Sequence, residues 1–149
     1  MAVEKVLSKD FVLNVNTGTD QSPTWTKLGS RKSLTMALAP TTVDLADADT
    51  DGWNDDRIVG YALSFTATAN RLEDPDSGAR DSGQAAFEAV MFETGQDNVL
   101  QCQIVTPGGE EWVFHATVSC QPFGGDFKAG ADWQVVLSCS GAPVVGQGS

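Results

Sequence analysis

The residues best suited to chemistry are aspartates, six of which stand within thirteen positions in the stretch DLADADTDGWNDD, residues 44–56. Carboxylates at alternate positions are the ligands that calcium loops use. An EF-hand-like count started at residue 47 takes oxygen donors from Asp47, Asp49, Asp51, the Trp53 carbonyl and Asp55. The twelfth position, where a bidentate glutamate belongs, is Ile58, and neither flank has a helical pattern. Two interpretations stay open: a calcium loop outside the EF-hand class, or a solvated acidic loop that turns at Asp51–Gly52.

The rest of the sequence offers little for catalysis. Its single histidine, His115, lies on the polar side of an alternating segment, with no second histidine or cysteine near it on that face. Adjacent carboxylates occur at residues 55–56, 73–74 and 110–111 and read most simply as solvated charge. The sequence has no phosphate-binding glycine loop, dinucleotide fingerprint or nucleophile elbow. We therefore expect neither an enzyme nor a cofactor.

Charge is unevenly distributed along the chain, whose formal net charge is −11. Residues 1–43 hold five bases and three acids, whereas residues 44–149 hold four bases and seventeen acids. A chain with this excess of negative charge is not expected to bind nucleic acid, because phosphate binding needs a cationic patch. The same surface suits a place where DNA must pass without sticking.

The compartment predicted from the sequence is a cytoplasm. The N-terminal residues MAVEKVLSKDFVLNV lack the apolar core of a signal peptide, and no stretch approaches the apolar length of a membrane span. The chain has three cysteines, an odd number without a Cys-x-x-Cys pair, which suits a reducing environment. Cys102, Cys120 and Cys139 each fall on the apolar side of an alternating segment, where a free thiol packs as a small hydrophobe.

Alternation of apolar and polar residues dominates the sequence and predicts β-strands. The alternating runs are residues 11–15, 34–38, 58–68, 100–104, 112–120 and 133–139. TPGGE at residues 106–110 lies between two of these runs and predicts a hairpin turn. The length of the chain and this pattern predict a single domain, residues 1–149.

Residues 81–95 break the alternation and predict one helix. Asp81 with Gln84 three residues later resembles a capping box, and Gly95 stands where a C-terminal cap would lie. The helix is expected to pack on the sheet through a stripe of Phe87, Val90 and Met91.

Three connections are long for a compact domain, at residues 40–56, 71–80 and 121–131. The first is the acidic loop, expected to run from Pro40 to Asp56. The C-terminal residues, from about 141 to 149, are predicted to be a flexible tail.

The order of these features resembles the tail tube (major tail) protein of long-tailed bacteriophages. The resemblance rests on a strand and a long loop ending in DTDGWNDDRIVGYALSFTATAN, then DSGQAAFEAVMFETG, a hairpin and a last strand, ADWQVVLSCSGAP. It covers residues 11–143 and implies a mainly β fold, a β-sandwich or barrel with one flanking α-helix. It also implies hexameric rings that stack into a hollow tube in the virion tail, through which the genome leaves. Other tail proteins would bind the tube ends, assembly would occur in the host cytoplasm, and DNA would pass the lumen without specific binding.

In that family the long loop reaches the adjacent ring, which here implies an inter-ring contact made by Asp44, Asp47, Asp49, Asp51, Trp53, Asp55 and Asp56. The charge asymmetry suggests Lys27, Arg31 and Lys32 as its basic partners. Two alternatives remain. The chain is an inner-tube subunit of a contractile or type VI secretion-like apparatus, or it is a calcium-binding β-sandwich module that recognises a protein or carbohydrate.

Overall fold

The computed structural model describes residues 3–47, 49, 51–125 and 130–147. Its strands are β1 (Val12–Asn16), β2 (Trp25–Lys27), β3 (Arg31–Asp44), β4 (Asp56–Asn70), β5 (Val99–Val105), β6 (Glu110–Gln121), β7 (Asp132–Cys139) and β8 (Val144–Gln147). The helical elements given whole by the described residues are α1 (Ser82–Glu88) and the 3-10 turns η1 (Ser8–Asp10) and η3 (Gly95–Asn98). The predicted mainly β fold with one α-helix is confirmed.

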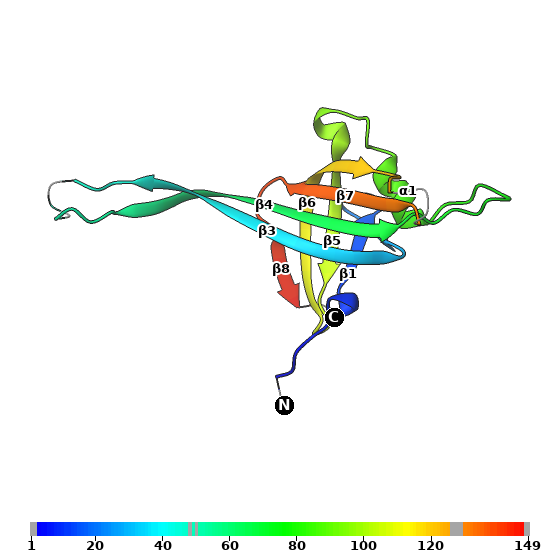
Figure 1. Cartoon of the computed structure of the whole chain (residues 1–149), viewed down its shortest axis with the longest axis horizontal. Coiled ribbons are helices and arrows are strands. Elements are labelled where there is room, and N and C mark those ends of the chain that lie inside the picture. Colours follow the sequence, from blue (N-terminus) through cyan, green and yellow to red (C-terminus); the bar gives the residue numbers. More distant parts are fainter. Residues whose placement is uncertain (1–2, 48, 50, 126–129, 148–149) are drawn as a thin grey trace.

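All of these strands belong to one antiparallel sheet in the order β2-β1-β5-β6-β7-β4-β3, with β8 beside β6. Figure 1 shows the sheet folded across itself, so that β3 and β4 cross over β5 and β1. β7 pairs with residues 116–121 of β6, whereas β8 pairs with residues 110–113. The sheet therefore forks at β6, which pairs with β7 along one part of its length and with β8 along another. The other edge of β7 pairs with β4.

The core lies between the crossing parts of the sheet. Because successive strand residues point to opposite faces, every second residue enters the core along residues 65–69 of β4, 114–118 of β6 and 133–137 of β7. The rings of Phe65 on β4 and Phe114 on β6 stack with their centroids 4.8 Å apart. The alternating runs predicted most of this core, which includes Leu13, Val15, Ala67, Cys102, Ile104, Ala116, Val118, Val135 and Leu137.

The helix begins where the sequence predicted but ends sooner. The Asp81 carboxylate caps α1 by accepting from the Gln84 backbone N–H at 3.1 Å. The Phe87 ring packs against Trp133 with centroids 5.9 Å apart. The last helical residue is Glu88, and Gly95 opens η3 instead of closing α1, so the predicted helix end is wrong.

A buried glutamine fixes α1 to the chain around it. The Gln84 amide nitrogen donates to the Asn70 carbonyl at 2.8 Å and to the Gly29 carbonyl at 3.3 Å. Its amide oxygen accepts from the Leu72 backbone N–H at 3.2 Å. The side chain is fully buried, and these hydrogen bonds give both its amide nitrogen and its amide oxygen a partner.

Two expected irregular segments are in fact strands. Residues 40–44 extend β3 and pair with β4, so the acidic loop covers only residues 45–55. Pro40 is tolerated because β3 is an edge strand, where a missing N–H breaks no ladder bond on the outer side. Residues 144–147 form β8 on β6, where a flexible tail was expected from about residue 141.

Candidate functional site

The β3–β4 hairpin extends far beyond the rest of the molecule (Figure 1). We call residues 36–63 of this hairpin the arm, and its connecting residues 45–55 the acidic turn. Directly paired residues place their side chains on the same face, and the pairs are Met36 with Phe65, Leu38 with Leu63, and Pro40 with Tyr61. The core-facing side of the hairpin therefore continues outward along the arm as a row of large apolar side chains.

Exposure along this row rises with distance from the body. Phe65 is 4% exposed, but Met36 and Leu38 on the opposite strand are 49% and 51% exposed, and Tyr61 is 65% exposed. The other face of the arm carries the small pairs Ala37–Ser64, Ala39–Ala62 and Thr41–Gly60. The arm is thus an amphipathic ribbon whose apolar face is not covered by the body of the molecule. An apolar face of this kind marks a surface that another molecule covers.

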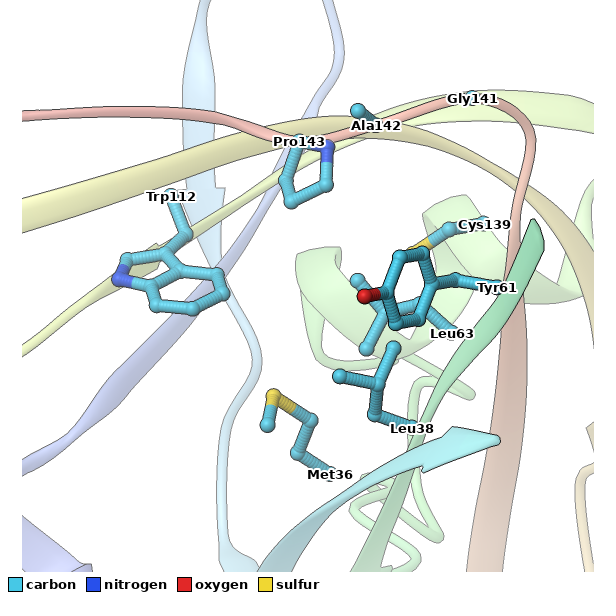
Figure 2. A pocket seen from close by; sticks show the side chains of 9 residues that line it. All are labelled: Met36, Leu38, Tyr61, Leu63, Trp112, Cys139, Gly141, Ala142 and Pro143. Atoms are coloured by element: carbon cyan, nitrogen blue, oxygen red, sulfur yellow. The ribbon is translucent and has the colours of Figure 1, made fainter. Parts of the chain in front are cut away.

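The inner part of this row lines a groove of about 520 Å³ at the fork of the sheet. We call it the apolar groove. Figure 2 shows Met36, Leu38 and Tyr61 on one side, with Trp112 and Pro143 on the other. The Trp112 indole N–H donates to the Glu110 carboxylate at 2.6 Å, which fixes the ring at the rim. A smaller groove of about 340 Å³ shares Met36 and Trp112 and reaches toward Phe65, so the apolar surface is continuous.

The acidic turn is held by its own backbone and carboxylates. Leu45 N–H donates to the Asp55 carbonyl at 2.8 Å, and the Asp44 carboxylate accepts from the backbone N–H of Ala46 at 2.8 Å. Asp51 and Gly52 have φ angles of 54° and 83°, the left-handed region that the predicted turn requires. Asp55 pairs with Arg57 at 3.1 Å.

Most of the acidic turn faces solvent. Asp44, Asp47, Asp49, Asp51 and Asp56 are exposed. Asp55 is half-buried, and the indole of Trp53 is 77% exposed. Among the described residues, no three histidine, cysteine, aspartate or glutamate side chains converge in a way that could hold a metal ion. The expected calcium donors Asp47, Asp49, Asp51, Trp53 and Asp55 share one turn without forming such a group.

The three predicted basic partners have different surroundings. The Arg31 guanidinium donates to the carbonyls of Ser8 at 2.8 Å and Phe11 at 2.6 Å, and its burial lowers its pKa. Lys32 pairs with Asp132 at 2.7 Å. Lys27, the last residue of β2, is exposed. Residues 31 and 44 are the two ends of β3, and thirteen rises of about 3.3 Å separate them by roughly 43 Å. The basic residues and the acidic turn therefore do not meet within one chain.

The remaining titratable groups are structural or lie at the surface. His115 lies 3.2 Å from the exposed carboxylate of Asp20. Burial raises the pKa of the Cys120 thiol to about 12 and that of Cys139 to about 11, and it raises the pKa of Cys102 further. These thiols are protonated and weakly nucleophilic at neutral pH. No helix within the described ranges is long and apolar enough to cross a membrane.

The exposure of the arm's apolar face to solvent was not predicted from the sequence. Leu34, Met36 and Leu38 were identified as an alternating strand, and such a strand is expected to bury its apolar side in its own core. The available signal was length, because fourteen residues in β3 and fifteen in β4 exceed what a small domain covers.

No protein-family model and no curated protein matches the sequence. Solved structures do share its fold. A chain from the tail of an empty gene transfer agent particle, determined by helical refinement with C6 symmetry, gives a TM-score of 0.71 at 14% identity, covering 97% of this chain and 100% of that one. A chain from the native gene transfer agent virion gives 0.69 at 14% identity, covering 95% and 99%. A chain of the sheath–tube complex of an extracellular contractile injection system in its extended state gives 0.60 at 10% identity, covering 96% and 92%. At these identities the comparison establishes a shared fold: the chain is folded like proteins that form particle tails and an injection system.

Proposed function

We propose that this chain is a non-enzymatic structural subunit of a phage-like tail tube. Copies of it assemble into hexameric rings, and the rings stack into a hollow tube through which DNA is delivered. The observation that carries the proposal is the uncovered apolar face of the arm, where Met36, Leu38 and Tyr61 remain about half or more exposed in the isolated chain. The fold shared with a helical, C6-symmetric particle tail supports six copies per ring.

The shape of the arm favours a contact between different surfaces of neighbouring copies. The arm projects from one side of the body, and the apolar groove lies at its base (Figures 1 and 2). A projection that packs on a different surface of the next copy makes a heterologous interface, which closes as a ring or continues as an open filament. Other tail proteins then bind the two open ends of the filament.

The charge of the chain supports passage of DNA without binding. With a net charge of −11 for each copy, a tube of many copies carries a large excess of negative charge. Such a field repels phosphates, and counterion release cannot drive DNA binding on an anionic wall. We expect the tube to form in the cytoplasm of a host cell and to end in a virion tail.

A second candidate function is the inner tube of a contractile apparatus. It is favoured by the fold shared with a chain of the sheath–tube complex of a contractile injection system. The two functions differ in whether a sheath surrounds the tube. Two strongly exposed aromatic side chains, Phe92 at 87% and Phe123 at 71%, are candidates for a contact with a sheath.

The test is negative-stain electron microscopy of the purified full chain over a concentration series, with and without a calcium chelator. We expect hollow tubes of uniform bore above a threshold concentration, unchanged by the chelator. A chain that stays monomeric at every concentration contradicts the proposal. Tubes that dissolve with the chelator alone favour calcium in the acidic turn as the element that orders it.

A further inference from the structure

A further groove, lined by cations, lies at the opposite end of β3 from the acidic turn. Its volume is about 240 Å³, and Lys9, Lys27 and Arg31 line it together with Phe11 and the start of β1. We call it the cationic groove. Arg31 is anchored on carbonyl oxygens, which shapes the wall without neutralising the charge. Lys9 and Lys27 are exposed, and neither has an ion-pair partner among the described residues.

The basic residues that line the cationic groove differ from the three basic partners expected from the sequence. Lys32 does not line the groove, and its ammonium group is engaged by Asp132 at 2.7 Å. Lys9, which was not among the predicted partners, takes its place because η1 brings residue 9 beside the end of β2. The arrangement depends on the Arg31 contacts to Ser8 and Phe11, which sequence spacing does not reveal.

We infer that the cationic groove receives aspartate side chains from the acidic turn of a second copy. This inference rests on the proposed function, and charge complementarity supports it. The turn and its flanks carry six aspartates, and Arg57 is the base nearest to them in the sequence. In the groove, Lys9 and Lys27 have no ion-pair partner within the described ranges. A groove of about 240 Å³ is smaller than the roughly 300–1,000 Å³ of small-molecule sites, so it fits one or two side chains of the turn.

The positions of the two surfaces define the repeat of the assembly. Because the groove and the turn lie at opposite ends of a strand of about 43 Å, docking one into the other displaces successive copies by about that distance along β3. Any tilt of β3 from the tube axis makes the axial repeat shorter. The contact is heterologous and leaves a free turn at one end of the assembly and a free groove at the other, so growth is polar.

The experiment is a charge exchange between the two surfaces of the full chain. One variant combines Lys9→Glu and Lys27→Glu, and a second combines Asp47→Lys and Asp49→Lys. Each variant alone presents like charges to its own copies, so we expect the threshold concentration for tubes to rise at least about tenfold. In an equimolar mixture each turn meets a groove of opposite charge, so we expect tubes at a threshold within about threefold of the original chain.

The control is Lys5→Glu, which makes the same charge change on an exposed residue outside the groove. It should leave the threshold unchanged, and the far-ultraviolet circular dichroism and urea midpoint of every variant should match the original. If the original chain forms no tubes, the proposed function fails. If it forms tubes and the lysine variant assembles equally well, the inference alone fails. The inference also fails if both variants are blocked but their mixture does not assemble.

Discussion

Removing the apolar side chains of the arm should raise the threshold concentration for assembly while the monomer stays folded. The change is Leu38→Thr with Tyr61→Thr, because threonine keeps the preference for a strand and removes most of the apolar surface. Both residues lie on the apolar face, at 51% and 65% exposure. The hairpin ladder on either side of them is unaltered, because its hydrogen bonds are made by the backbone.

The magnitude follows from the area still open to water. Burying a whole leucine or a side chain of similar size contributes about 1.5–3 kcal/mol. Since roughly half of Leu38 and two thirds of Tyr61 remain to be buried, the two contribute together about 2–3 kcal/mol per arm. At 1.4 kcal/mol for each factor of ten, the threshold concentration for tubes should rise at least roughly 30-fold. The free energy of unfolding of the monomer should fall by about 1–2 kcal/mol, for the part of the two side chains that is already buried.

The assay is pelleting by ultracentrifugation over a concentration series, with urea unfolding of the monomer alongside. The control is Val3→Thr, which also replaces an apolar residue by threonine, at a residue that is fully exposed outside the arm. Equal thresholds for the double variant and the control would refute the idea that the apolar face of the arm is an interface. A double variant that unfolds at much lower urea would show that this face stabilises the monomer instead.

Three further predictions concern the fold. Gln84→Leu removes three hydrogen bonds between a buried side chain and the backbone and should lower the free energy of unfolding by about 3 kcal/mol, with a loss below 1 kcal/mol contradicting its role. Gly83→Ala places a methyl group against the backbone of β2 and should cost roughly 1–3 kcal/mol, whereas Gly124→Ala, in open space, should cost far less. Burial raises the pKa of Cys120 from 9.0 to about 12 and of Cys139 from 9.0 to about 11, so the stability that these two thiols contribute should be constant below pH 9 and be lost between pH 9 and 12. Urea midpoints that fall equally in that range when both cysteines are alanine would contradict this cause.

Much of the fold could be predicted because local rules and tertiary packing agree. Alternation identified the cores of β4, β6 and β7, since a half-buried strand must place apolar residues at every second position. Asp81 identified the start of α1, because its carboxylate satisfies a backbone N–H that has no partner within the helix. The helix end was not predictable from Gly95, since the chain closes α1 at Glu88 and continues through further turns before that residue.

The candidate site was predicted only in part, for physical reasons that involve distant residues. The acidic turn and its reversal at Asp51–Gly52 could be read from local composition. The apolar face of the arm could not, because alternation reveals which side of a strand is apolar and not whether the body covers it. Trp112 and Pro143 meet the arm only through the fork in the sheet, a long-range feature that no local pattern encodes.

The measurement that tests the account most directly is a cryo-electron microscopy reconstruction of tubes assembled from the purified chain, at a resolution that shows side chains. The account predicts rings of six copies with Leu38 and Tyr61 buried against a neighbouring copy, and an axial repeat of no more than about 43 Å if the acidic turn docks in the cationic groove. Tubes in which the apolar face of the arm remains open to solvent would contradict the central claim.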